Sequence, residues 1–388
     1  MLEVTRTVND NLTDHPMLLS YMEWQGMIQG EPSPVMGSLR LGDVLQLRNM
    51  DKEQFMADYE KFVREREDGL HHTSDNEEYM LYGRIPCVVQ LPIQDMLDAE
   101  MAECSYNIAL AEFGRQWLEE AFKIKEPSIL MGTGIEGLTA DSRIMSGEYS
   151  VADCAVPYNQ DFEGMEDVRG VFRILTAIPL VMVIDTRQAN GRMMPESMEQ
   201  LLLPEYKDSI MYPDDGHMLD SIMLTYFYHA AGIEGVYKFR KNAIGGAHPS
   251  QMIKPGGLEK KPFIMLMPWI FATIKAKEDG MCLVWPGDGA PILPLVITKK
   301  QDGTEKEREL FHFLTGERTG QIFRSQGCFP SSCAEVENQL PGKLRFIGWD
   351  FLYQEDLLDI IAECRKIMEE REDDSYEADH SGGTTGGR

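Results

Sequence analysis

Long apolar segments are absent from this chain of 388 residues. No run reaches the roughly 18–20 apolar residues that a helix needs to cross a membrane. The two most apolar stretches, Ile178–Ile184 and Phe263–Phe271, have the length of buried strands instead. We therefore do not expect the protein to span a membrane.

Basic residues are also scarce. The sequence has 37 Lys and Arg against 64 Asp and Glu, which gives a formal net charge of -27. A field of this sign repels phosphate backbones and anionic lipid headgroups. We therefore expect no nucleic-acid partner and no anionic membrane surface as a partner.

Paired cysteines and a secretory signal are missing as well. The seven cysteines are scattered, and no two are spaced as C-x-x-C, which argues against a zinc knuckle and a disulfide framework and suits a reducing compartment. The opening segment MLEVTRTVNDNLTDHP has neither the basic nor the apolar region of a signal peptide. We expect a cytoplasmic protein, or a periplasmic or extracellular one if the N-terminus is incomplete.

The length predicts two or three domains, because single cores stop growing near roughly 250–300 residues. Residues 1–66 predict a small helical domain. A helix that carries Met17, Leu18, Tyr21 and Met22 is expected to be capped by Asn11, Thr13 or Asp14, and a later helix is expected to begin at Asp51. We predict that residues 67–78 form a linker. We predict a disordered tail over residues 372–388, because they have no apolar face to bury.

From residue 79 to 364 short apolar runs alternate with helical patterns, which is typical of an α/β fold. The predicted strands are Tyr79–Cys87, Ser128–Met131, Val171–Ile184, Ser209–Tyr212, Phe263–Met267, Met281–Val284 and Ala290–Thr298. The predicted helices are Ile93–Phe122, Glu196–Leu202, Met218–Ala231, Val236–Asn242, Glu307–Thr315, Thr319–Gln326 and Gln354–Arg371.

Six segments between residues 170 and 352 carry a resemblance to a known family. They read GVFRILTAIPLVMVIDTRQ, PESMEQLLLPEYKDSIMYPDDGHML, AHPSQM, WPGDGAPILPLVITKK, FRSQGCFPSSCAEVENQLP and FIGWDFL. In this order they resemble the ABC-transporter substrate-binding proteins of the type 2 periplasmic-binding-protein fold, in a signal-less branch related to the ferric and small-solute binders. The first 66 residues resemble a small helical domain of unknown function, without the cysteine pair that this domain often carries.

The resemblance implies two α/β lobes that face each other across a cleft, plus the N-terminal all-helical domain. The chain would cross between the lobes on two hinge segments, Thr176–Asp185 and Ala290–Lys299. Lobe 1 would comprise residues 79–175 and 290–364, and lobe 2 residues 176–289. Ligands of open α/β sheets bind at the carboxyl ends of strands, so the loops after the strands hold the candidate site residues.

Two loops of lobe 1 follow such strands. Cys87 ends the first strand, and Gly132-Thr133-Gly134 follows the second, where its amides could meet an anion or simply turn the chain.

Lobe 2 contributes the other candidates. Each has a structural alternative: an aspartate can cap the next helix, polar loop side chains can bind local backbone, and tryptophans can be core. The candidates are Asp214, Asp215 and His217 as a polar clamp or metal ligands, His248, Ser250 and Gln251 as orienting groups, and Trp269, Trp285 and Asp288 as an aromatic wall with a carboxylate.

Tyrosinate iron binding is not expected. Ferric-binding relatives place adjacent tyrosines just after the strand that corresponds to Phe263–Met267, where this chain has Met267-Pro268-Trp269-Ile270. Tyr226 and Tyr228 lie two apart in a predicted helix and so point in different directions. The sequence therefore assigns no metal and no cofactor.

The resemblance implies a solute-binding protein that captures a metal ion, an oxyanion or a small polar metabolite between its lobes. It would deliver that ligand to an ABC-transporter permease or act as a cytosolic sensor. The alternative is an enzyme on the same fold with Cys87 as nucleophile and Glu136 or His217 as base. No Walker loop, H-E-x-x-H or G-x-S-x-G motif is present, so we expect no enzyme. A third possibility is an interaction module built on residues 1–66 beside a vestigial cleft.

Overall fold

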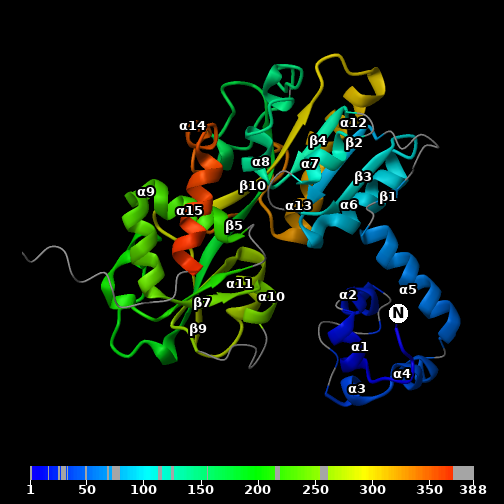
Figure 1. Ribbon diagram of the computed structural model, residues 1–388, viewed down its shortest axis with the longest axis horizontal. Coiled ribbons are helices and arrows are strands. Elements are labelled where there is room, and N and C mark those ends of the chain that lie inside the picture. The colour runs from blue at the N-terminus through cyan, green and yellow to red at the C-terminus, as the bar shows by residue number, and fades with distance from the viewer. Residues whose placement is uncertain are drawn as a thin grey trace, which may run out of the picture.

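The computed structural model contains an N-terminal helical domain and two α/β lobes, as Figure 1 shows. The structure describes residues 2–15, 17–24, 27, 32, 34–48, 50–67, 70–71, 79–111, 116–123, 126–154, 156–214, 219–253 and 261–369.

The described residues of the N-terminal domain form five helices: α1 (Val8–Asp14), α2 (Met17–Trp24), α3 (Pro34–Ser38), α4 (Leu41–Leu47) and α5 (Lys52–Glu67). They enclose a separate core, in which the ring of Tyr21 lies 5.0 Å from Phe55 and 4.9 Å from Phe62. Aromatic pairs at these separations contribute more than their buried area alone. The helical domain expected from the sequence is therefore present.

The helix for which the sequence offered Asn11, Thr13 or Asp14 as a cap is α2, and these three residues belong instead to α1, a helix that the sequence did not predict. Thr7 caps α1 and forms a capping box with Asp10, so Asn11 lies inside the helix, where its side chain binds backbone carbonyls. The cap expected for the later helix is correct, because the Asp51 carboxylate accepts the amide of Gln54 at 2.8 Å.

Lobe 1 contains four neighbouring strands in the order β1-β3-β2-β4. They are β1 (Leu70–His71), β2 (Leu81–Ile85), β3 (Tyr106–Leu110) and β4 (Ile129–Gly132), with helices α6 (Cys87–Glu100), α7 (Gln116–Ala121) and α8 (Ile135–Thr139). Strand β2 is parallel to β3 and to β4. The single long helix expected over 93–122 is wrong, because β3 and α7 replace its second half. A five-residue apolar run such as YNIAL does not distinguish a strand from a buried helical segment by periodicity.

Two long antiparallel strands cross between the lobes: β5 (Arg173–Asp185) and β10 (Ala290–Lys299). The first half of β5 pairs with β10, and the second half, from Leu180 on, pairs with β8 (Ile264–Pro268) and β9 (Met281–Val284). Every residue of β5 is buried. Such a strand reads as a continuous apolar run, which is why the sequence predicted both crossings.

Lobe 2 is completed by β6 (Ile210–Pro213), β7 (Ala243–Ala247), α9 (Leu219–Asn242), α10 (Pro249–Met252) and α11 (Trp269–Lys275). Strand β6 is parallel to β7 and to β8. Helix α9 is broken at Ala231 and Gly232, which have non-helical backbone angles, with Gly232 at φ 62°. The break separates the two helices that the sequence predicted here.

The C-terminal part returns to lobe 1 and then contacts lobe 2. It contains α12 (Glu305–Thr315), α13 (Glu317–Gly327), β11 (Leu344–Arg345), α14 (Trp349–Leu352) and α15 (Leu357–Glu369). Helix α14 contacts α8, whereas α15 packs along α9 and its Arg365 donates a hydrogen bond to Ser221 (Figure 1). Short 3-10 helices occur at Ile144–Ser146, Gln160–Phe162, Thr186–Gln188, Glu199–Leu202 and Pro204–Tyr206. The predicted tail over 372–388 and most of the predicted linker over 67–78 lie outside the described residues.

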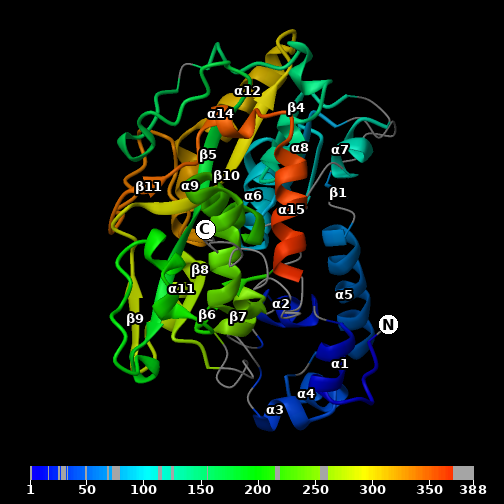
Figure 2. The ribbon, with the colours of Figure 1, turned by 60° about the vertical axis from the view of Figure 1, so that its left-hand side comes forward.

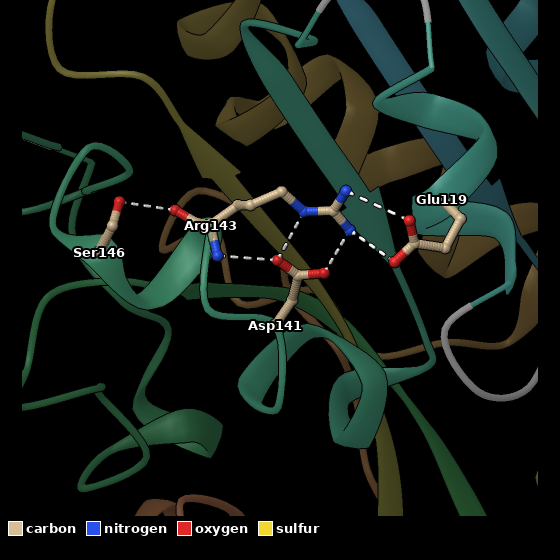
Figure 3. A network of polar contacts seen from close by, with 4 residues as sticks. All are labelled: Glu119, Asp141, Arg143 and Ser146. Carbon is tan, nitrogen blue, oxygen red and sulfur yellow. Dashed lines mark hydrogen bonds and ion pairs between the residues drawn. The ribbon is translucent and has the colours of Figure 1, made fainter.

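A polar network holds the segment after α8 against α7 (Figure 3). The Arg143 guanidinium donates to the fully buried Asp141 carboxylate at 2.6 and 3.0 Å and to Glu119 at 3.0 Å. The hydrogen bonds that Arg143 donates to Asp141 raise the pKa of Arg143. Its guanidinium also lies 4.1 Å from the ring centre of Phe122. The network therefore fixes the segment that follows α8.

Candidate functional site

A cavity of about 240 Å³ lies between the lobes, at the carboxyl ends of their strands. Its lining comes from lobe 1, from lobe 2, from the crossing strand β5 and from the segment after α13. The lining residues are Pro86, Cys87, Val88, Leu110, Ala111, Ile178, His248, Pro249, Pro268, Ile270, Phe271 and Phe329. This is the position at which open α/β sheets bind their ligands.

Strand pairing positions the residues that line the cavity from lobe 1. Strands β2 and β3 are parallel with Ile85 opposite Leu110, so both strands end at the same edge. Pro86 then starts α6, and its fixed φ suits the position before the first helical turn. Cys87 follows as the first residue of α6, and its side chain is exposed. Leu110 is 40% exposed, which is unusual for a leucine beside a buried strand.

A histidine cap shapes the lobe 2 side. His248 follows β7 and caps the short helix α10, because its Nδ1 accepts the amide of Ser250 at 3.2 Å. The Ser250 hydroxyl lies 2.7 Å from the same nitrogen. Since Nδ1 accepts a backbone hydrogen bond, the neutral ring carries its proton on Nε2, which is then the nitrogen left to meet a ligand.

The structure brings together some of the predicted site residues. Cys87 and His248 line one cavity from opposite lobes. Ser250 lies beside His248 as its capping partner, and Gln251 is exposed. Asp214 is exposed at the end of β6, where its amide donates to Ala247 of the neighbouring strand. Asp215 and His217 lie outside the described residues.

The Gly-Thr-Gly segment belongs to a different, smaller cavity. Gly132 is a buried strand residue, and a side chain there would meet the indole of Trp117 at 3.1 Å. Thr133 and Glu136 line a cavity of about 20 Å³ between α8 and α9. Its other lining residues are Ile135, Ser221, Ile222, Thr225, Leu293, Leu352, Leu357 and Ile361. The C-terminal helix α15 therefore contributes to its wall through Leu357 and Ile361. Gly134 is buried at the start of α8.

Trp269, Trp285 and Asp288 have packing partners within the protein. The two indoles meet edge to face at 5.3 Å, and Trp285 Nε1 donates to the Lys343 carbonyl at 2.9 Å. None of the three is among the described residues that line either interlobe cavity. Their assignment to the ligand site stays a prediction.

Asp288 joins three separate segments. Its carboxylate accepts the Met198 amide and the Tyr226 hydroxyl, each at 3.0 Å, and lies 3.3 Å from the Arg345 guanidinium. Burial and the neighbouring Asp288 carboxylate raise the pKa of Tyr226. Tyr226 is thus a neutral hydrogen-bond donor rather than a metal-binding tyrosinate.

The structure places Cys87 and Glu136, the nucleophile and one of the two bases of the enzyme alternative, apart from each other. Cys87 and Glu136 line different cavities, and His217 lies outside the described residues. Within the described part of the chain, no group of three or more His, Cys, Asp or Glu side chains is arranged to hold a metal ion. None of the described helices combines the length and the apolar character that crossing a bilayer requires.

Several lining residues were missed from the sequence because they are apolar. Leu110 and Ala111 would have followed from the rule for strand ends if β3 had been recognised. Ile270, Phe271 and Phe329 carry no polar signal that separates a cavity wall from ordinary core.

Solved structures share this fold across most of the chain. A periplasmic binding protein, P5PA, has a TM-score of 0.55 at 14% identity, covering 75% of this chain and 99% of its own. A Bordetella ferric binding protein has a TM-score of 0.53 at 13% identity, covering 75% and 98%. The protein AfuA from Actinobacillus pleuropneumoniae, solved with exogenous fructose-6-phosphate bound, has a TM-score of 0.53 at 10% identity, covering 75% and 98%. These likenesses establish the two-lobed fold.

A search of curated proteins finds no match to this chain. A family profile described as bacterial extracellular solute-binding protein matches residues 142–355, which is more than half of the sequence. The matched range includes the crossing strand β5, the whole of residues 176–289 and the return strand β10. The chain therefore belongs to the bacterial extracellular solute-binding protein family.

Proposed function

We propose that the protein binds a small solute in the cavity between Cys87 and His248 and closes its two lobes over it. The observation that carries this proposal is the cavity itself, because both lobes and the crossing strand β5 contribute to its wall. A ligand held there contacts both lobes at once, so its binding energy favours the closed arrangement.

Strand pairing supports the hinge. Strand β5 pairs with β10 as far as Pro179 and with β8 and β9 from Leu180 on, so the two sheets join through two strands. We propose 79–175 with 290–364 as lobe 1 and 176–289 as lobe 2. A short change of backbone angles in two strands is a hinge of the kind that closes binding proteins around their ligands.

The described lining favours an uncharged solute with an apolar body and one polar group. Ten of the twelve lining residues are apolar, and the thiol of Cys87 and the imidazole of His248 are the polar exceptions. A bare metal ion or a phosphate needs opposite charges or several donors to offset its lost hydration. An apolar solute instead gains from the aromatic and aliphatic wall, while His248 Nε2 orients its polar end.

We further propose a binding role without catalysis, with delivery of the solute to an ABC-transporter permease. The separation of Cys87 from Glu136 supports the absence of a nucleophile and base pair. The family description favours an extracellular or periplasmic site of action, and the cytoplasmic location expected from the sequence stays a prediction.

The test fills the cavity from within. Ala111→Trp places an indole inside the cavity, and Ala102→Trp adds the same indole at an exposed position of lobe 1 as a control. Each variant is titrated with the uncharged fluorophore N-phenylnaphthylamine, after thermal unfolding has shown that it is folded. We expect the wild type and the Ala102 variant to bind the probe and the Ala111 variant to lose at least about tenfold in affinity. Equal binding by all three would overturn the proposed cavity, and a response only to ferric citrate or a hexose phosphate would overturn the ligand class.

A further inference from the structure

The N-terminal domain is attached to the two elements of lobe 1 that end at the cavity. After α5 the chain forms β1, which pairs antiparallel with β3, with Leu70 opposite Asn107 and His71 opposite Tyr106. Helix α5 itself contacts β3, as Figure 1 shows. The C-terminal residue of β3, Leu110, lies in the cavity wall. One attachment of the domain therefore leads directly to the site.

The second attachment is helix α6. Leu91 of α6 packs against the core of the N-terminal domain. Cys87, which lines the cavity, lies four residues earlier in the same helix. Residues at this spacing share one face of a helix and lie one turn apart. A single face of α6 thus contacts the cavity at one turn and the N-terminal domain at the next. Figure 2 shows α2 and α5 below α6.

Buried hydrogen bonds join α6 and β3 into one unit. The Gln94 and Gln90 side chains donate to the Ile108 carbonyl at 2.9 and 3.3 Å, and the Tyr106 hydroxyl donates to Asp98 at 2.5 Å. Both glutamines are about 1% exposed, so water does not compete with these bonds. A displacement of the cavity rim therefore moves α6 and β3 together.

We propose that the N-terminal helical domain reports closure of the lobes: contact of lobe 2 with Cys87 and Leu110 is transmitted through α6 and β3 to Leu91 and β1. The proposal rests on the proposed function, because lobe closure is the two-state element that the domain would read. The N-terminal domain would then present a surface whose stability depends on whether the cavity is occupied.

The experiment closes the lobes without a ligand. His248→Cys places a second thiol in the cavity that contains Cys87, and a short bismaleimide bridges the two in the full-length protein. The same variant treated with a monofunctional maleimide carries both modifications without the bridge. Hydrogen exchange is then compared over α4 and α5. We expect exchange in α5 to slow by at least about threefold on bridging.

A second variant tests the path. Leu91→Ala removes the contact with the N-terminal core, and Leu47→Ala removes an equally large side chain that is 75% exposed in the same domain. In the bridged protein the slowing of exchange should disappear with Leu91→Ala and persist with Leu47→Ala. Unchanged exchange in bridged protein would overturn the coupling and leave solute binding intact. Failure of the bridge to form, judged by intact mass, would show that the two positions share no cavity and would overturn both proposals.

Discussion

Cys87 and His248 start helices on opposite lobes, and both side chains reach the same cavity. The reason is topological, because each residue follows a strand that runs toward the interlobe edge of its sheet. Two residues far apart in the sequence thereby line the same cavity. Their different local roles, an exposed thiol and a helix cap, allow each to be tested separately.

Cys87 should react with maleimide before the other six cysteines. It alone is exposed, whereas Cys104, Cys333 and Cys364 are buried and burial raises the pKa of each of these three thiols. We expect Cys87 to be modified at least about tenfold faster than these three. Peptide mapping over a time course measures this, with Cys87→Ser as the control. A rate far above that of an ordinary accessible thiol would favour the enzyme alternative.

His248 should contribute to solute binding independently of its cap. His248→Asn keeps a good capping residue for α10 and removes the imidazole, whereas His248→Ala removes both. We expect the free energy of unfolding of the Asn variant to lie within about 0.5 kcal/mol of the wild-type value, and that of the Ala variant to be lower by about 1 kcal/mol. Both should bind N-phenylnaphthylamine about fivefold more weakly if Nε2 meets the solute. Binding unchanged in the Asn variant would limit His248 to capping.

The strands and helices were predicted most reliably where one physical signal dominates the sequence. The crossing strands β5 and β10 are buried on both faces, so their apolar runs are long and uninterrupted. Strand β3 is short and lies between two helices, so its apolar residues continue a helical pattern. Helix α1 was missed because Asn11, Thr13 and Asp14 form a polar group that suits the segment before a helix, although Thr7 and Asp10 have capping-box spacing.

The site was predicted less completely than the fold. The rule for strand ends selected Cys87 and His248, but it cannot select apolar wall residues such as Phe271, whose type is the same in a core. A carboxylate between glycines, as at Asp288, is chemically equally suited to a ligand and to an internal hydrogen-bond hub. Only the three-dimensional positions of Tyr226 and Arg345 distinguish the two.

Asp288 should be important for stability rather than for solute binding. Asp288→Ala leaves the Met198 amide and the Tyr226 hydroxyl without this acceptor, and it removes one of the two carboxylates that pair with Arg345. We expect the free energy of unfolding to fall by about 2–3 kcal/mol. Tyr226→Phe removes one of these bonds and should cost about 1 kcal/mol. Chemical denaturation measures both, and a loss of probe binding in folded Asp288→Ala protein would return this residue to the ligand site.

Arg143 should be needed to hold the segment that follows α8 in place. Arg143→Ala removes the guanidinium that binds the fully buried Asp141 carboxylate, and because this guanidinium is itself 32% exposed we expect a loss of about 2 kcal/mol. Arg143→Lys restores the charge without the paired donors and should recover only part of that loss. Denaturation curves of the two variants measure the difference. Equal stability of both variants and the wild type would mean that the network in Figure 3 contributes nothing.

Alkaline pH should destabilise the protein through its buried thiols. Burial raises the pKa of Cys333 and Cys364 from an ordinary 9.0 to about 11. The folded state therefore holds these protons more tightly than the unfolded chain, so the stabilisation is complete below pH 9 and is lost as the pH rises toward 11. The loss should reach about 2 kcal/mol per thiol near pH 11. Tyr158 and Tyr206, whose pKa values burial raises to about 12, extend the decline. Guanidinium unfolding across this range measures how the free energy of unfolding changes with pH. Cys364→Ala removes one of the titrating thiols and should reduce this slope. A flat profile would show that the thiols are not protonated preferentially in the folded state.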